Sequence, residues 1–166
     1  MNSSNVADDT AQYTKKETDG SLFWYDEIMK NKQDIYDYLN SQSLMVLSTV
    51  SEYGQPQSAL VGFGQSPDLQ LIIGTNKRSR KVTNILNNNL VSAVISWGAC
   101  TIQYQGTARL LNGDEKEHFC GLYFAKSPDA KQYSKDPNEC YFVIEPTWIR
   151  YTDVSTYPWE VTEFNY

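Results

Sequence analysis

The feature that most restricts what this chain can fold into is a change of hydrophobic period after Ser43. From Leu44 onward, short runs with apolar residues at every second position alternate with turn segments rich in Gly, Pro, Asn and Asp. Such runs are typical of half-buried strands, and short connections join antiparallel neighbours. The strands predicted in this way span residues 44–51, 57–64, 69–75, 91–97, 101–111, 141–145 and 148–153, with an edge strand at 160–164.

The number of strands and their short connections predict a mainly β fold, an antiparallel barrel with peripheral helices. Closure into a barrel removes the exposed edges that an open sheet would present. Pro146 lacks an N–H donor and is expected to separate the two late strands. Apolar residues at helical spacing predict one helix from Tyr25 to the polar residues at 40–43, and shorter helices over 79–88 and 114–125.

The chain has the length of one domain, at 166 residues. Residues 1–20 are mostly polar and are predicted to form a flexible tail, with the folded domain over 21–166. The net charge of −6 disfavours a nucleic-acid partner, and no stretch reaches the ~20 apolar residues that a membrane-spanning helix needs. The first residues do not resemble a secretory signal. The three cysteines show no paired spacing, so we expect free thiols and a cytoplasmic location.

One segment suggests chemistry, because four of the five residues from Lys77 to Lys81 are basic in a chain of negative net charge. A strand is expected to end just before this segment, and a helix is expected to begin after Ser79 as its N-cap. Arg80 and Lys81 then lie in the first helical turn, where the helix dipole disfavours cations. An anion bound there would remove the conflict. A solvated basic loop, a nuclear-targeting signal and a nucleic-acid contact are the alternatives.

These residues resemble a known family, the FMN-binding split-barrel proteins related to pyridoxamine 5'-phosphate oxidase. The similarity extends over about residues 39–153 and implies an antiparallel split barrel. The residues that carry it are Thr75-Asn76-x-x-Ser79-Arg80-Lys81, then Leu86, Asn89 and Trp97, the turn Gly54-x-Pro56, and the strands 59–64 and 102–106.

The resemblance implies a set of FMN-binding residues. Arg80 and Lys81 would bind the flavin phosphate, and Gly74 and Thr75 would lie against the ribityl chain or the ring. Thr101 stands where the family has a glutamine that contacts the flavin. The strand segment that would pack along the isoalloxazine is Ala59, Leu60, Val61 and Gly62.

The sequence also departs from the family pattern. Ala59 replaces an arginine at the start of the flavin strand, and Gly64 replaces the lysine that closes it. The Arg-Leu-His element with which the true oxidases hold their substrate is not found at residues 148–153. The resemblance therefore implies FMN binding without the vitamin B6 substrate.

The function implied is that of an FMN-dependent oxidoreductase acting on an unassigned small molecule, with NAD(P)H as a candidate reductant. The flavin supplies the reactive atom in such enzymes, so no catalytic side chain is assigned. A homodimer with FMN at the subunit interface is expected. The alternatives are a flavin-binding module without activity and a barrel that binds haem. With His118 as the only histidine, no metal site is predicted.

Overall fold

The computed structural model describes residues 17–18, 21–22, 31–96 and 98–166. Near the N-terminus, β1 (Glu17–Thr18) and β2 (Ser21–Leu22) form a two-stranded antiparallel pair. The flexible tail expected over residues 1–20 stays a prediction. Within the described residues, no helix is long and apolar enough to cross a membrane.

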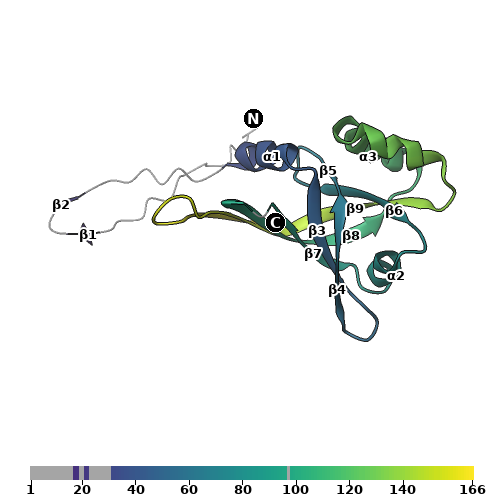
Figure 1. The fold of residues 1–166 in the computed structure, drawn as a ribbon, viewed down its shortest axis with the longest axis horizontal. Coiled ribbons are helices and arrows are strands. Elements are labelled where there is room, and N and C mark those ends of the chain that lie inside the picture. Colours follow the sequence, from purple (N-terminus) through teal and green to yellow (C-terminus); the bar gives the residue numbers. More distant parts are fainter. Residues whose placement is uncertain (1–16, 19–20, 23–30, 97) are drawn as a thin grey trace, which may run out of the picture.

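The rest of the described chain is built on one antiparallel sheet of eight strands, curled into a half-barrel (Figure 1). Neighbouring strands follow the order β4-β3-β7-β8-β9-β6-β5. The first half of β9 pairs with β6, and its second half pairs with β10. The predicted mainly β, antiparallel split barrel is thereby confirmed. The strands are β3 (Leu44–Val50), β4 (Pro56–Gly62), β5 (Gly64–Gln65), β6 (Leu71–Asn76), β7 (Leu90–Ile95), β8 (Cys100–Leu110), β9 (Glu139–Asp153) and β10 (Glu160–Asn165).

The alternation that predicted the strands also defines the core. In β3 and β7 every second side chain is buried, as expected for strands with one covered face. Ile35 and Leu39 of α1 (Lys32–Ser41) pack against this face. The core residues that β3, β7 and β8 contribute include Met45, Leu47, Val91, Ala93, Ile95, Ile102 and Tyr104.

The described part of the first helix begins later than the spacing predicted. Asn31 has an extended backbone (φ −87°, ψ 175°), and it forms a capping box with Asp34, so α1 cannot continue upstream through it. Tyr25, on which the predicted start was placed, lies outside the described residues. The capping box therefore sets the start of α1 at Lys32.

The other two predicted helices are present with nearly the predicted bounds. The second is α2 (Arg80–Asn87), and the third is α3 (Gly113–Lys126). A 3₁₀ helix, η1 (Pro128–Lys135), follows α3 and was not predicted. Apolar side chains of α3 cover the outer face of β6 and β9 and form a second core cluster, which includes Ile72, Phe119, Cys120, Tyr123, Tyr141 and Val143.

Pro146 does not separate two strands, which corrects the sequence-based prediction. β9 is continuous from Glu139 to Asp153, and Pro146 lies at a bulge in its pairing with β8. Gly106 of β8 is paired with Pro146, whereas the neighbouring Gln105 is paired with Trp148. Thr147 is thus left without a partner on β8, and a proline is tolerated beside it because the β8–β9 ladder is already interrupted there.

Lys126 joins the end of α3 to α1 and β5. Its Nζ donates to the carbonyl of Leu39 (2.8 Å) and to Oε1 of Gln65 (2.6 Å), and it lies 3.6 Å from the centroid of the Phe63 ring. Burial lowers the pKa of Lys126 to about 7. A neutral amine still has two N–H groups, so both hydrogen bonds survive deprotonation.

This lysine gives a prediction about pH. The unfolded chain keeps Lys126 protonated up to its ordinary pKa of 10.5, whereas the folded chain releases the proton above about pH 7. The unfolded state therefore binds more protons between these values, and stability from this site rises with pH. Relative to Lys126→Met, the wild type should gain about 1 kcal/mol in free energy of unfolding between about pH 7 and pH 9, because solvent screens the exposed part of the ammonium group. Urea unfolding of both proteins at the two pH values measures it, and an unchanged difference would show that the folded lysine stays charged.

Candidate functional site

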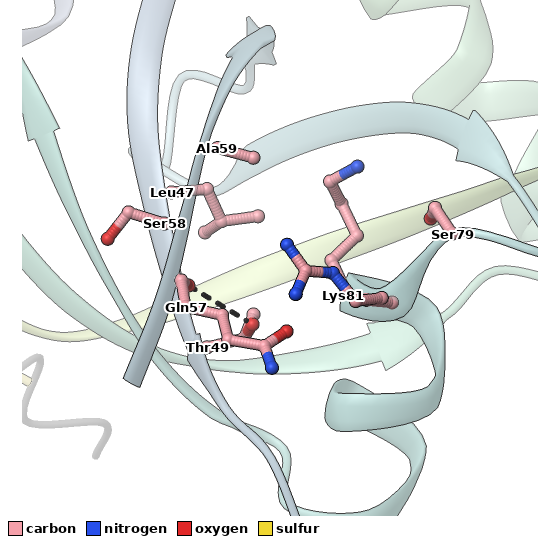
Figure 2. A pocket seen from close by; sticks show the side chains of 8 residues that line it. Leu47, Thr49, Gln57, Ser58, Ala59, Ser79 and Lys81 are labelled. Carbon is pink, nitrogen blue, oxygen red and sulfur yellow. Dashed lines mark hydrogen bonds between the residues drawn. The ribbon is translucent and has the colours of Figure 1, made fainter. Parts of the chain in front are cut away.

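A cavity of about 220 Å³ lies between the β3–β4 hairpin and the N-terminal turn of α2. Leu47 pairs with Ala59 and Thr49 with Gln57, so these side chains share the face of the hairpin that looks toward α2. Figure 2 shows Lys81 and Ser79 facing these strand residues across the cavity. The lining residues are Leu47, Thr49, Gln57, Ser58, Ala59, Ser79, Arg80 and Lys81.

Positive charge is concentrated at the N-terminus of α2. Ser79 has the extended backbone of an N-cap (φ −74°, ψ 144°), as predicted, but its side chain makes no capping hydrogen bond. Its hydroxyl lies instead 3.2 Å from Oγ1 of Thr75, to which Nζ of Lys81 also donates at 3.4 Å. The first turn of α2 contains no acidic residue. Backbone N–H groups, the helix dipole and two cationic side chains therefore act together at this end of the helix.

The structure divides the basic run into two parts. Arg80 and Lys81 line the cavity. Lys77 donates from Nζ to the carbonyl of Pro137 (2.8 Å), and the backbone N–H of Arg78 is bound by Oδ1 of Asn76 (2.9 Å). Only the half of the run that belongs to α2 faces the hairpin, because the loop before the helix turns toward residues 136–138.

The structure brings three of the predicted site residues together, namely Ala59, Arg80 and Lys81. Thr75 is joined to them through Lys81. Leu60 points to the opposite face of the sheet and is 58% exposed, while Val61 packs partly into the main core. Gly62 ends β4 near the Tyr123 hydroxyl.

The remaining two predicted residues lie away from the cavity. A Cβ on Gly74 would meet Glu139, Tyr141 and Tyr123 at 2.9–3.2 Å, so this glycine makes room for the packing of α3. Thr101 lies on β8, and β3 and β7 separate β8 from β4. Their contacts with a cofactor stay predictions.

Sequence reasoning missed several residues at this site. Leu47, Thr49 and Gln57 line the cavity because of the β3–β4 register. Asn84 is 5% exposed and donates from Nδ2 to Oγ1 of Thr49 (2.9 Å) and to Oε1 of Gln57 (3.1 Å). The sequence contains one indication of this role for Asn84, namely that a polar residue stands between Val82 and Ile85 on the apolar face of α2.

Other parts of the described chain offer less chemistry. A cavity of about 310 Å³ lies on the outer face of the sheet beside Leu90 and Ser92, and one of about 400 Å³ lies between α3 and η1 beside Lys116 and Tyr141. Among the described residues, no group of three His, Cys, Asp or Glu side chains could hold a metal ion. All three cysteines are free.

Comparison with known proteins agrees with this architecture. The chain is 29% identical over 108 residues to a pyridoxine/pyridoxamine 5'-phosphate oxidase of Ehrlichia ruminantium (strain Welgevonden), an alignment that covers 64% of this chain and 53% of the relative. The chain spans about half the length of the curated relatives it matches.

Solved structures show the same fold. General Stress Protein 26 from Bacillus anthracis str. Sterne is 26% identical with a TM-score of 0.61, over 72% of this chain and 92% of that one. A heme binding protein from Mycobacterium smegmatis is 17% identical with a TM-score of 0.68, over 76% and 54% of the two chains. The sequence profile of pyridoxamine 5'-phosphate oxidase matches residues 32–153. The chain therefore belongs to the pyridoxamine 5'-phosphate oxidase-related family of split-barrel proteins.

Proposed function

We propose that this chain binds FMN with its phosphate at the N-terminus of α2 and works as an FMN-dependent oxidoreductase on a small molecule. The observation that carries the proposal is the meeting of Arg80, Lys81 and an uncapped helix N-terminus at one cavity. This donor set suits a phosphate, because guanidinium, ammonium and backbone N–H groups all donate to anionic oxygens. Family membership supports the same cofactor.

The residues of the cavity would bind and orient the cofactor. Arg80 and Lys81 would hold the phosphate, and the short side chain of Ala59 leaves space along β4. When bound, FMN supplies hydride and electron transfer. The substrate stays unassigned, with NAD(P)H as a candidate reductant. We place the protein in the cytoplasm, where its three free thiols would stay reduced.

We also propose a homodimer. Thr101 is separated from β4 by two strands, and we propose that a second copy brings its own Thr101 to a flavin bound near Ala59. The outer face of the sheet carries Leu60 (58% exposed), Leu90 (62%) and Val94 (44%), and burial of these side chains would favour association. Analytical ultracentrifugation at micromolar concentration should give twice the chain mass of 19.0 kDa. A monomer would contradict the proposal.

Haem is the second candidate cofactor, because a similar fold occurs in a heme binding protein from Mycobacterium smegmatis. The only histidine of the sequence, His118, is exposed on α3 and does not line the cavity beside α2. A haem in that cavity would need another axial ligand, which favours FMN.

The absorption spectrum of the protein tests both candidates. After incubation with FMN and gel filtration, we expect a retained flavin spectrum that NAD(P)H or dithionite bleaches under anaerobic conditions. Retention with bleaching by dithionite alone would favour a flavin-binding module over an NAD(P)H-dependent enzyme. A Soret band after incubation with haemin, together with loss of FMN on the column, would favour haem instead.

A further inference from the structure

We propose that Asn84 is a positioning residue for the anion site: its buried carboxamide fixes α2 against the β3–β4 hairpin and keeps Arg80 directed at the ligand. This inference rests on the proposed function, because the anion is taken to be the FMN phosphate. Asn84 does not line the cavity itself. It acts through residues that do.

The first argument is the hydrogen bonding of the buried amide. Asn84 is 5% exposed, and both hydrogens of its Nδ2 are used, toward Oγ1 of Thr49 (2.9 Å) and Oε1 of Gln57 (3.1 Å). Thr49 belongs to β3 and Gln57 to β4, and both line the cavity. One NH₂ group therefore connects the three elements that form the walls of the site.

The second argument is the position of Asn84 on α2. Arg80 precedes Asn84 by four residues, so the two side chains are neighbours on one face of the helix. Fixing Asn84 against the hairpin fixes the rotation of α2 about its axis, and with it the direction in which Arg80 leaves the helix. Lys81 is held separately, through its contact with Thr75.

The third argument concerns the acceptors around the cavity. Asn84 donates to Oε1 of Gln57 and Oγ1 of Thr49 and so orients both side chains toward its own amide, and the Ser58 hydroxyl is hydrogen-bonded to Ser48 (2.8 Å). Among the described residues, no acceptor forms a hydrogen bond or ion pair with the Arg80 guanidinium. The guanidinium is thus left for an external anion, and removal of Asn84 would free Gln57 to compete for it.

Stability and binding can be separated at this position. If Asn84 is replaced, the Thr49 hydroxyl still donates to the carbonyl of Gln57 (3.4 Å). Gln57 is only half-buried, so water can reach its side-chain oxygen. A leucine has the same branching and the same number of side-chain heavy atoms as asparagine, and it would lie beside the buried Val82 and Ile85. Asn84→Leu should therefore fold, and its effect should appear in ligand affinity.

Calorimetric titration tests the proposal with FMN, riboflavin and inorganic pyrophosphate. Asn84→Leu should weaken FMN binding about tenfold, which corresponds to ~1.4 kcal/mol, and leave riboflavin binding unchanged. In an Arg80→Ala background the same substitution should change FMN affinity less than about twofold, because the residue through which Asn84 acts has been removed. Asn87→Leu, at an exposed asparagine of the same helix, is the matched control and should leave FMN affinity unchanged.

Three results would overturn the positioning role: unchanged FMN affinity in Asn84→Leu, an equal loss for FMN and riboflavin, or an undiminished loss in the Arg80→Ala background. If the wild type binds pyrophosphate but not FMN, the proposed function fails, and the role of Asn84 is then decided by the same comparisons made with pyrophosphate. If the wild type binds neither, both proposals fail.

Discussion

Replacement of Lys81 by alanine should weaken FMN binding by about 10- to 150-fold, since a hydrogen bond to a charged group contributes roughly 1.5–3 kcal/mol and each decade of affinity corresponds to about 1.4 kcal/mol. Arg80→Ala should have an effect of the same size, because both side chains line the cavity at the N-terminus of α2. The fold should survive in both variants, since removal of a cation from a helix N-terminus is neutral or slightly stabilising. Fluorescence titration of FMN with each purified variant measures the loss.

The basic run supplies matched controls for this experiment. Lys77→Ala and Arg78→Ala remove the same charges from residues that do not line the cavity, so both should bind FMN as the wild type does. Riboflavin, which lacks the phosphate, should bind the wild type poorly and respond little to Lys81→Ala. Equal losses of FMN and riboflavin would mean that Lys81 supports the structure, and unchanged FMN affinity in both cavity variants would remove the main support for the flavin proposal.

The second large effect is expected at Gly106, opposite the bulge in β9. A Cβ at this position would clash most closely with the carbonyl oxygen of Glu145 and would lie 2.8 Å from Cγ2 of Ile144. The closer atom belongs to the backbone of a central strand and cannot move without disturbing the β8–β9 pairing. Gly106→Ala should therefore lower the free energy of unfolding by about 3 kcal/mol, the upper part of the range for overpacked cores.

Gly121 provides the control for that measurement. It lies in α3 with no atom within 4 Å of an added Cβ, so Gly121→Ala should be neutral or should stabilise the protein by up to ~1 kcal/mol through helix propensity. Guanidinium unfolding of both variants gives the comparison. A Gly106→Ala protein as stable as the wild type would show that β9 can shift at the bulge.

Much of the architecture could be predicted from local pattern. The alternation in residues 44–50 and 90–95 reflects one covered face, and this pattern is a property of neighbouring residues in the chain. The helix over 80–87 and its basic first turn were equally local signals, and they led to the proposed anion site. The prediction that Pro146 ends a strand was wrong because the effect of a proline depends on the strand opposite. Pro146 lies at a bulge facing Gly106, so β9 continues through it.

By itself, the sequence determined most of the strands, the antiparallel class of fold and the electrostatic conflict at Arg80 and Lys81, because periodicity and charge are encoded by residues close together in the chain. Only the tertiary structure decided which side chains meet those cations. Thr49 and Gln57 reach the cavity through strand register, and Asn84 joins them through the rotation of α2 against the sheet. The rotation of α2 is fixed by packing between residues distant in sequence, and the register of the β3–β4 hairpin by the geometry of its turn, neither of which the apolar pattern specifies.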